Sequence, residues 1–193
     1  MGMEVYAYTA TPRTTPESKH DNGYIVPGTG DPTGSIPAKW FSGLDKPSLH
    51  TFLSSNLDVL LISLPLTAAT HHFISTAELE LLSSPGSPPS PSKQKLGGTF
   101  IANISRGQII DQVELERFCR KGKLRGAALD VTHPEPLPKE SGLWDIEGVA
   151  VTPHISGLSL AYIDRSLQIL ELNLNNLKTG KKLINIVDRE KGY

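Results

Sequence analysis

The stretch LDVLLISLPL, residues 57–66, is an almost unbroken apolar run. Strands that are covered on both faces of a parallel sheet read in this way, whereas half-exposed strands alternate apolar and polar residues. Three further short apolar segments follow in the chain: TFIAN (99–103), GAALDV (126–131) and GVAVT (148–152). We therefore expect a parallel sheet in which residues 58–64 form a strand buried on both faces.

Helix signals lie between these strands. Pro47 suits a first helical position, and Asn56 can end that helix in the left-handed conformation. Ser75 with Glu78 forms a capping-box pair, and Asp111 caps a helix that Gly122 ends. Strands that alternate with helices imply right-handed crossovers. The predicted fold class is α/β, a doubly wound parallel sheet.

The first 56 residues add one early strand and much loop. MGMEVYAY (1–8) begins on strand formers, and residues 10–47 are rich in Thr, Pro, Gly and Asp, with a short strand expected near Trp40 and Phe41. The glycine-rich segment GTGDPTG (28–34) follows Val26 and Pro27 instead of a strand. We interpret it as a turn and not as a phosphate-binding loop.

Two segments have more than one interpretation. Residues 84–98, SPGSPPSPSKQKLGG, support neither helix nor strand, and we expect a mobile surface insertion; the alternative is a docking site for a polyproline reader. In the last predicted helix, leucines and isoleucines recur at helical spacing from Leu160 to Leu177. We expect this stripe to pack on the protein's own core, the alternative being a coiled-coil seam.

Composition excludes several classes of partner. The 193 residues contain 19 Lys and Arg against 20 Asp and Glu, so there is no basic field for nucleic acid or an anionic membrane. No apolar stretch reaches the length of a membrane span, and no secretory signal is visible. Cys119 is the only cysteine, which rules out an internal disulfide. We expect a cytoplasmic protein that acts on small molecules and has no metal site.

Polar residues follow three of the predicted strands. Arg106 follows TFIAN, Asp130 and Glu135 follow GAAL, and His154 follows GVAVTP. Ligands bind at the carboxyl ends of the strands in such sheets. A guanidinium can hold a carboxylate by two parallel bonds, and an imidazole fixed by a carboxylate can donate or accept a proton near neutral pH. His133 lies inside the turn, and we reject it as the acid.

The segments NISRGQIID (103–111), GAALDVTHPEPLP (126–138) and VTPHISG (151–157) resemble, in order and separation, the signatures of the D-isomer-specific 2-hydroxyacid dehydrogenases. The resemblance implies an oxidoreductase that transfers a hydride between NAD(P)H and a small 2-keto or 2-hydroxy acid. Arg106 would bind the substrate carboxylate, Glu135 would bond His154, and His154 would exchange a proton with the substrate oxygen. A glutamine replaces Glu135 in the formate-oxidising branch, which argues against that branch.

The resemblance also implies a set of cofactor-binding residues. Asp130 would fix the carboxamide of the nicotinamide, and the residue that ends the first strand would select between NAD and NADP. An acidic residue there favours NAD. This chain instead has Thr9, Thr11 and Arg13, which favours NADP slightly. The other implied cofactor contacts are Leu64, Pro65, Thr70, Ile104, Ser156 and Gly157.

The family's glycine loop, which follows its first strand, has no counterpart here. MGMEVYAY matches the family's second strand, so we expect a truncated Rossmann-type sheet, interrupted where the central first strand would lie. A cut or proteolysed chain and a gene model that starts at an internal methionine both explain this. We expect residues 1–157 to be a partial NAD(P)-binding domain and 158–193 a C-terminal helix and tail of the substrate domain.

The sequence is compatible with three functions. The first is a dehydrogenase fragment that is inactive alone and a homodimer when full length. The second is a dinucleotide-sensing corepressor of the same fold, which would associate with partners without turnover. The third is a noncatalytic truncated product that binds no dinucleotide.

Overall fold

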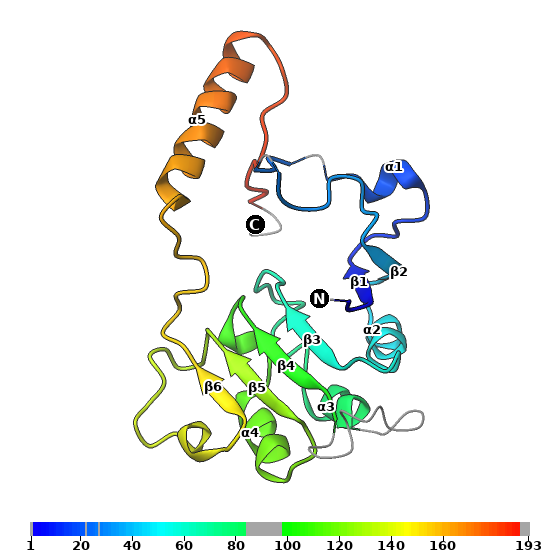
Figure 1. Cartoon of the computed structure of the whole chain (residues 1–193), viewed down its shortest axis with the longest axis vertical. Coiled ribbons are helices and arrows are strands. Elements are labelled where there is room, and N and C mark those ends of the chain that lie inside the picture. The colour runs from blue at the N-terminus through cyan, green and yellow to red at the C-terminus, as the bar shows by residue number, and fades with distance from the viewer. Residues whose placement is uncertain (1, 22, 27, 84–97, 190–193) are drawn as a thin grey trace. The chain divides into compact units, whose positions relative to one another are not determined.

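The computed structural model describes residues 2–21, 23–26, 28–83 and 98–189 (Figure 1). The chain divides into two compact units, residues 1–52 with 158–193, and residues 53–157. The predicted domain division, 1–157 and 158–193, stays a prediction. The predicted insertion at 84–98 lies outside the described residues except for Gly98.

The first unit contains a two-stranded parallel sheet. β1 (Val5–Thr9) pairs with β2 (Pro37–Ser42), so the strand predicted near Trp40 and Phe41 is confirmed. Helix α1 (Pro16–Lys19) lies between them in the chain, and α2 (Lys46–Leu53) follows β2. The ring of Phe52 lies 5.2 Å from Tyr8 and 5.3 Å from Phe41, between centroids. This aromatic cluster joins α2 to both strands.

The segment from Gly28 to Gly34 is a turn, as predicted. The Thr29 N–H donates to the Val26 carbonyl at 3.0 Å, and the Gly34 N–H donates to the Asp31 carbonyl at 3.0 Å. Gly28 and Gly30 have φ values of 76° and 73°, a backbone region that glycine adopts readily. No helix follows within the next residues, so these glycines do not present a helix N-terminus to a phosphate.

The second unit contains a four-stranded parallel sheet in the order β3-β4-β5-β6 (Figure 1). Its strands are β3 (Val59–Ile62), β4 (Phe100–Asn103), β5 (Gly126–Leu129) and β6 (Val149–Val151). Helix α3 (Thr76–Ser83) connects β3 to β4, and α4 (Gln112–Arg120) connects β4 to β5. Short 3-10 helices span Gly107–Ile109 and Gly142–Asp145. The parallel α/β fold predicted from the apolar runs is confirmed.

The predicted helix signals are found in the structure. The Ser75 N–H donates to Glu78 Oε2 at 2.9 Å, and Asp111 Oδ1 accepts the Glu114 N–H at 3.2 Å. Asn56 has a φ of 64° and Gly122 a φ of 65°, each just beyond the end of a helix. Local capping chemistry therefore sets these helix ends.

The described strands form two separate sheets, as the expectation of an interrupted sheet requires. β1 bonds β2 on one side, and β3 bonds β4 on one side. Among the described strands, none pairs with the other edge of β1 or of β3. Both edges therefore present backbone groups without a strand partner.

The prediction that residues 58–64 are buried on both faces is wrong. Leu60 and Ile62 are 6% and 4% exposed, but Val59 and Leu61 are 47% and 58% exposed. β3 is an edge strand, and only one of its faces contributes to the core of this unit. An apolar run therefore does not establish that a strand is covered on both sides.

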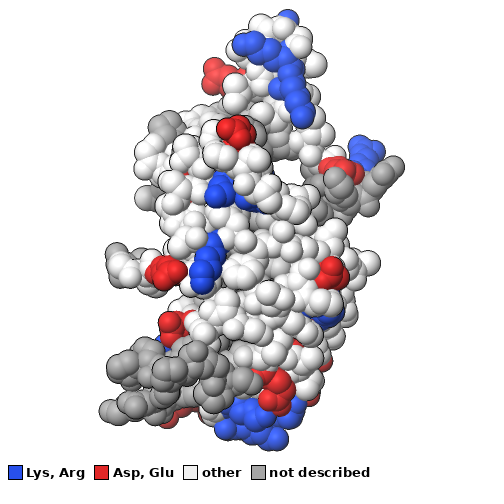
Figure 2. All heavy atoms as spheres, turned by 90° about the vertical axis from the view of Figure 1, so that its right-hand side faces the viewer, with Lys and Arg blue, Asp and Glu red and all other residues white. Residues whose placement is uncertain are grey.

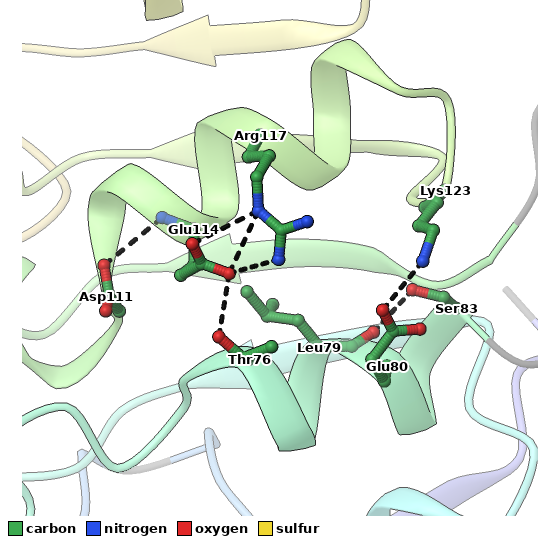
Figure 3. A network of polar contacts seen from close by, with 8 residues as sticks. All are labelled: Thr76, Leu79, Glu80, Ser83, Asp111, Glu114, Arg117 and Lys123. Atoms are coloured by element: carbon green, nitrogen blue, oxygen red, sulfur yellow. Dashed lines mark hydrogen bonds and ion pairs between the residues drawn. The ribbon is translucent and has the colours of Figure 1, made fainter.

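Helices α3 and α4 lie side by side and contribute the buried Leu79, Leu82, Leu115 and Phe118 to that core. Polar contacts lie between the two helices, within α4 and in the loop after α4 (Figure 3). The Thr76 hydroxyl donates to Glu114 Oε2 at 2.8 Å, Arg117 pairs with the same carboxylate, and Lys123 Nζ lies 2.7 Å from Glu80 Oε1. Exposed ion pairs of this kind add little to stability because water screens them, so the buried leucines dominate.

The expectation that the stripe of the last helix packs on the protein's own core is also wrong for the described residues. α5 spans Tyr162–Lys178, and Leu167, Leu170 and Leu174 are between 53% and 56% exposed. Only Asn176 of this helix is buried. The helix is held instead by its polar side: Asn173 Nδ2 donates to the Ile184 carbonyl, and Asn176 Nδ2 to the Lys182 carbonyl.

The surface matches the balanced composition. On the face shown in Figure 2, Lys and Arg side chains are interspersed with Asp and Glu among larger uncharged areas. Among the described residues, no helix is both long and apolar enough to cross a membrane.

Cys119 on α4 is predicted to be unreactive while the chain is folded. The side chain is buried, and burial raises the pKa of its thiol to about 11, so the thiolate is scarce at neutral pH. Iodoacetamide at pH 8 should leave the native chain unmodified and should modify it fully in urea, as read by intact mass. Rapid modification of the native chain would contradict the buried position.

Candidate active site

The loop after β4 positions Arg106 through a buried amide. Asn103, the last residue of β4, accepts the Ser105 N–H at 3.1 Å and the Ser105 hydroxyl at 2.9 Å, and its Nδ2 donates to the Arg106 carbonyl at 2.9 Å. Asn103 is 1% exposed, so these bonds are shielded from water. Sequence reasoning did not single out Asn103. A polar residue that ends a buried strand was the available signal.

The loop after β4 and the loop after β5 meet at Gly107. A Cβ built on Gly107 would lie 2.1 Å from the Thr132 carbonyl oxygen, which follows β5. Only a residue without a side chain permits this approach of backbone to backbone. The loop that carries Arg106 therefore lies against the loop that carries Glu135, as neighbouring parallel strands require.

The turn after β5 is fixed from two sides. The Thr132 hydroxyl donates to the Pro134 carbonyl at 3.0 Å, and the His133 N–H donates to Gln112 Oε1 on α4 at 2.9 Å. His133 is thus bound through its backbone. Glu135 follows in this turn, half exposed, with its carboxylate directed to the next loop.

The structure brings His154 and Glu135 together. His154 Nδ1 lies 2.6 Å from Glu135 Oε1, across the carboxyl ends of the adjacent strands β5 and β6. A carboxylate only accepts hydrogen bonds, so Nδ1 carries the proton in this contact and Nε2 is left to exchange one. A half-exposed pair of this kind adds little stability. Its effect is to orient the imidazole.

Asp130 directly follows β5 and is hydrogen-bonded to the loop that carries His154. Its carboxylate accepts hydrogen bonds from the Thr152 hydroxyl at 2.6 Å, the Ile155 N–H at 2.8 Å and the Ser156 N–H at 2.9 Å. Burial raises the pKa of this carboxyl, but the bonds from Ser156, Thr152 and Ile155 outweigh burial and hold the pKa well below its usual range. Asp130 is therefore ionised at neutral pH.

Arg106 lies on the neighbouring loop without a direct contact to the pair. Its Nη1 donates to the Ser105 carbonyl at 2.6 Å, and within the described residues no hydrogen bond or ion pair joins it to Glu135 or His154. The three predicted catalytic residues thus follow β4, β5 and β6 in order. The structure brings two of them into contact.

The predicted cofactor residues fall in both units. Thr70 Oγ1 donates to the Pro65 carbonyl at 2.7 Å and shapes the loop after Leu64. Ile104 is half exposed beyond β4, and a Cβ on Gly157 would meet no atom within 4 Å. In the first unit, the Thr9 hydroxyl donates to the Thr11 carbonyl at 2.8 Å. Arg13 donates to the Ser18 carbonyl, and its buried Nε has no partner within the described part of the chain.

Comparison with known proteins agrees with the three-loop geometry. The family model for the NAD-binding domain of the D-isomer-specific 2-hydroxyacid dehydrogenases matches residues 36–156. This chain belongs to that family. The matched residues contain all of β3 to β6 and the Arg106, Glu135 and His154 positions, so these side chains lie within the family's own domain.

Individual 2-hydroxyacid dehydrogenases extend the comparison. A glyoxylate/hydroxypyruvate reductase A of Salmonella paratyphi B is 34% identical, over 79% of this chain and 44% of its own length. The chain thus spans less than half of that relative. A dehydrogenase of Xanthobacter autotrophicus Py2, crystallised with NADPH and MES, superposes with a TM-score of 0.70 at 26% identity, over 100% of this chain and 64% of its own. An NADPH-dependent glyoxylate/hydroxypyruvate reductase of Sinorhizobium meliloti, crystallised with NADP and sulfate, gives 0.70 at 25% identity, over 100% and 50%.

Replacing Gly107 by alanine should destabilise this site's scaffold. The added Cβ would press on the Thr132 carbonyl, which is backbone and cannot rotate away, so a loss of about 2 kcal/mol or more in the free energy of unfolding is expected. Urea denaturation followed by circular dichroism measures it. Gly157→Ala is the matched control, because its Cβ meets open space and its midpoint should hardly move. Equal midpoints for the two variants would show that the loops do not approach as described.

Proposed function

We propose that the protein that carries this chain is an NAD(P)-dependent D-2-hydroxyacid dehydrogenase working as a reductase of small 2-keto acids. The observation that supports this best is the bond between His154 Nδ1 and Glu135 Oε1 at the carboxyl ends of adjacent parallel strands. Membership of the family and the names of the reductases above point the same way. Those names offer no support for the corepressor alternative.

Each of the three residues has a task in this proposal. Arg106 holds the substrate carboxylate with its planar guanidinium and orients the keto group. His154 Nε2 delivers a proton to the keto oxygen, and Glu135 keeps Nδ1 protonated while the positive charge on the ring changes. The nicotinamide supplies the hydride to the keto carbon when it is bound. The product is a 2-hydroxy acid, and in the reverse direction His154 takes the proton back.

Each unit, taken by itself, carries residues that suit a part of a dinucleotide. The half-exposed Ile104 and Ile155 offer apolar contact to a planar ring beyond the strand ends, and the open space at Gly157 leaves room beside His154. In the other unit, the unpartnered Nε of Arg13 is a buried donor without an acceptor among the described residues. A phosphate oxygen would satisfy it.

Turnover tests the catalytic assignment. His154→Ala in the protein that carries this chain should lower kcat by about 10²-fold to 10⁴-fold for NADPH oxidation with glyoxylate, hydroxypyruvate or pyruvate, because proton transfer is lost. His133→Ala is the matched control and should retain the wild-type rate, since the hydrogen bond that holds His133 comes from its backbone N–H. The absorbance of NADPH at 340 nm, followed by stopped-flow or steady-state kinetics, gives the kcat of both variants. Full activity in His154→Ala would exclude it as the acid.

For the cofactor we propose NADP, with homodimer formation expected of the whole protein. Thr9 and Thr11 supply hydroxyls and Arg13 a guanidinium where an acidic residue would select NAD. The Thr9 hydroxyl donates its one hydrogen to the Thr11 carbonyl at 2.8 Å, and a bound 2′-phosphate would take this hydrogen over. These groups suit a 2′-phosphate.

Replacing Thr9 by aspartate should shift the preference toward NAD. A new carboxylate repels the 2′-phosphate, so the ratio of the NADPH and NADH dissociation constants should change by at least about tenfold, a cost of 1.4 kcal/mol. Thr9→Asn, which adds bulk without charge, is the matched control. Fluorescence titration of both reduced dinucleotides in the protein that carries this chain measures the ratio. Equal ratios of the two dissociation constants in Thr9→Asp and Thr9→Asn would show that the 2′-phosphate does not bind beside Thr9.

A further inference from the structure

The backbone at His154 adopts an unfavourable conformation. Its φ is +54°, in the left-handed region that residues with a β-carbon rarely occupy. Its N–H donates to the Asp130 carbonyl at 2.9 Å and is shared with the Thr152 carbonyl at 3.0 Å. A conformation of this kind persists only where surrounding bonds hold it.

Asp130 supplies most of those bonds. The backbone carbonyl of Asp130 takes the His154 N–H, and its carboxylate takes the N–H groups of Ile155 and Ser156. The Thr152 hydroxyl donates to the same carboxylate from the other side of His154. One residue, 5% exposed, therefore binds the loop both before and after the imidazole.

We propose that Asp130 is a positioning residue which, with the Thr152 hydroxyl, holds His154 in its left-handed conformation and so keeps the imidazole on Glu135. The catalytic meaning of this role rests on the proposed function, but the structural part does not. It differs from the carboxamide contact that the family resemblance implies for Asp130. A carboxylate offers about four lone pairs; the Thr152 hydroxyl and the N–H groups of Ile155 and Ser156 use three, and the Ser156 side chain also interacts with this carboxylate.

Thr152 allows the positioning role to be separated from a cofactor contact. Its hydroxyl donates to Asp130 Oδ1 at 2.6 Å. A substitution at Thr152 therefore removes this bond without changing Asp130 itself. Thr152→Val removes the donor at nearly constant shape, whereas Thr152→Ser keeps it. If Asp130 acted only by contacting the cofactor, neither Thr152→Val nor Thr152→Ser would change how His154 is held.

The first test uses nuclear magnetic resonance of this chain without cofactor or substrate. In Asp130→Asn, amide hydrogen exchange at Ile155 and Ser156 should become at least about tenfold faster, and in Thr152→Val about threefold faster, because bonds to the loop are lost. The Nδ1 proton of His154 should broaden or vanish in both variants. Thr152→Ser should restore exchange rates and the Nδ1 signal.

Unchanged exchange and an unchanged His154 signal in Asp130→Asn and Thr152→Val would overturn the proposal. If Asp130→Asn does not give a folded spectrum, Thr152→Val decides, since it removes a single bond at the rim of the site. If Thr152→Ser did not restore the wild-type spectrum, the Thr152 hydroxyl would not be what holds His154 in place.

The second test uses turnover in the protein that carries this chain. Thr152→Val should lower kcat by about tenfold with little change in the dissociation constant of NADPH, and Thr152→Ser should restore kcat. A higher NADPH dissociation constant in Asp130→Asn, with both resonance readouts unchanged, would favour the carboxamide contact and overturn the proposal. Absence of turnover in the wild-type protein, with the resonance changes as expected, would remove the proposed function and support the positioning role.

Discussion

The parallel register of β4, β5 and β6 is the constraint on which the site depends. Phe100 pairs with Gly126 and Ala127 with Val149, so the carboxyl ends of the three strands lie side by side. The loops that leave these ends are then forced together. The approach of Gly107 to Thr132 joins the first two, and the Asp130 carboxylate and the Glu135 contact join the last two. Residues 48 positions apart, Arg106 and His154, belong to one continuous rim because of this order.

Local signals in the sequence were sufficient for the elements and for part of the site. Asp111, Asn56 and Gly122 mark helix ends through chemistry that acts within a few residues. The contact between Glu135 and His154 followed from three motifs in series, because the family resemblance fixed which strand ends meet. The turn at residues 28–34 was recognised from the absence of a strand before it.

Long-range burial was not predictable in the same way. The apolar run at 57–66 does not reveal that β3 is an edge strand, so the exposure of Val59 and Leu61 could not be deduced from it. The stripe of α5 has core-like spacing, but spacing does not say whether a partner surface is present. Asn103 escaped notice because its bonds run from a side chain to the backbone of residues 105 and 106, a tertiary detail of one loop.

Among the described strands, none pairs with the edge of β3 that faces away from β4, and this has a consequence for contacts between chains. This edge combines a row of backbone donors and acceptors with the exposed side chains of Val59 and Leu61, and Lys or Pro residues that would discourage pairing are absent from this strand. Such an edge is a template on which a strand of another chain can add, and Val59 and Leu61 give that added strand apolar side chains to pack on. The geometry that interrupts the sheet is therefore also what offers a site for pairing between chains.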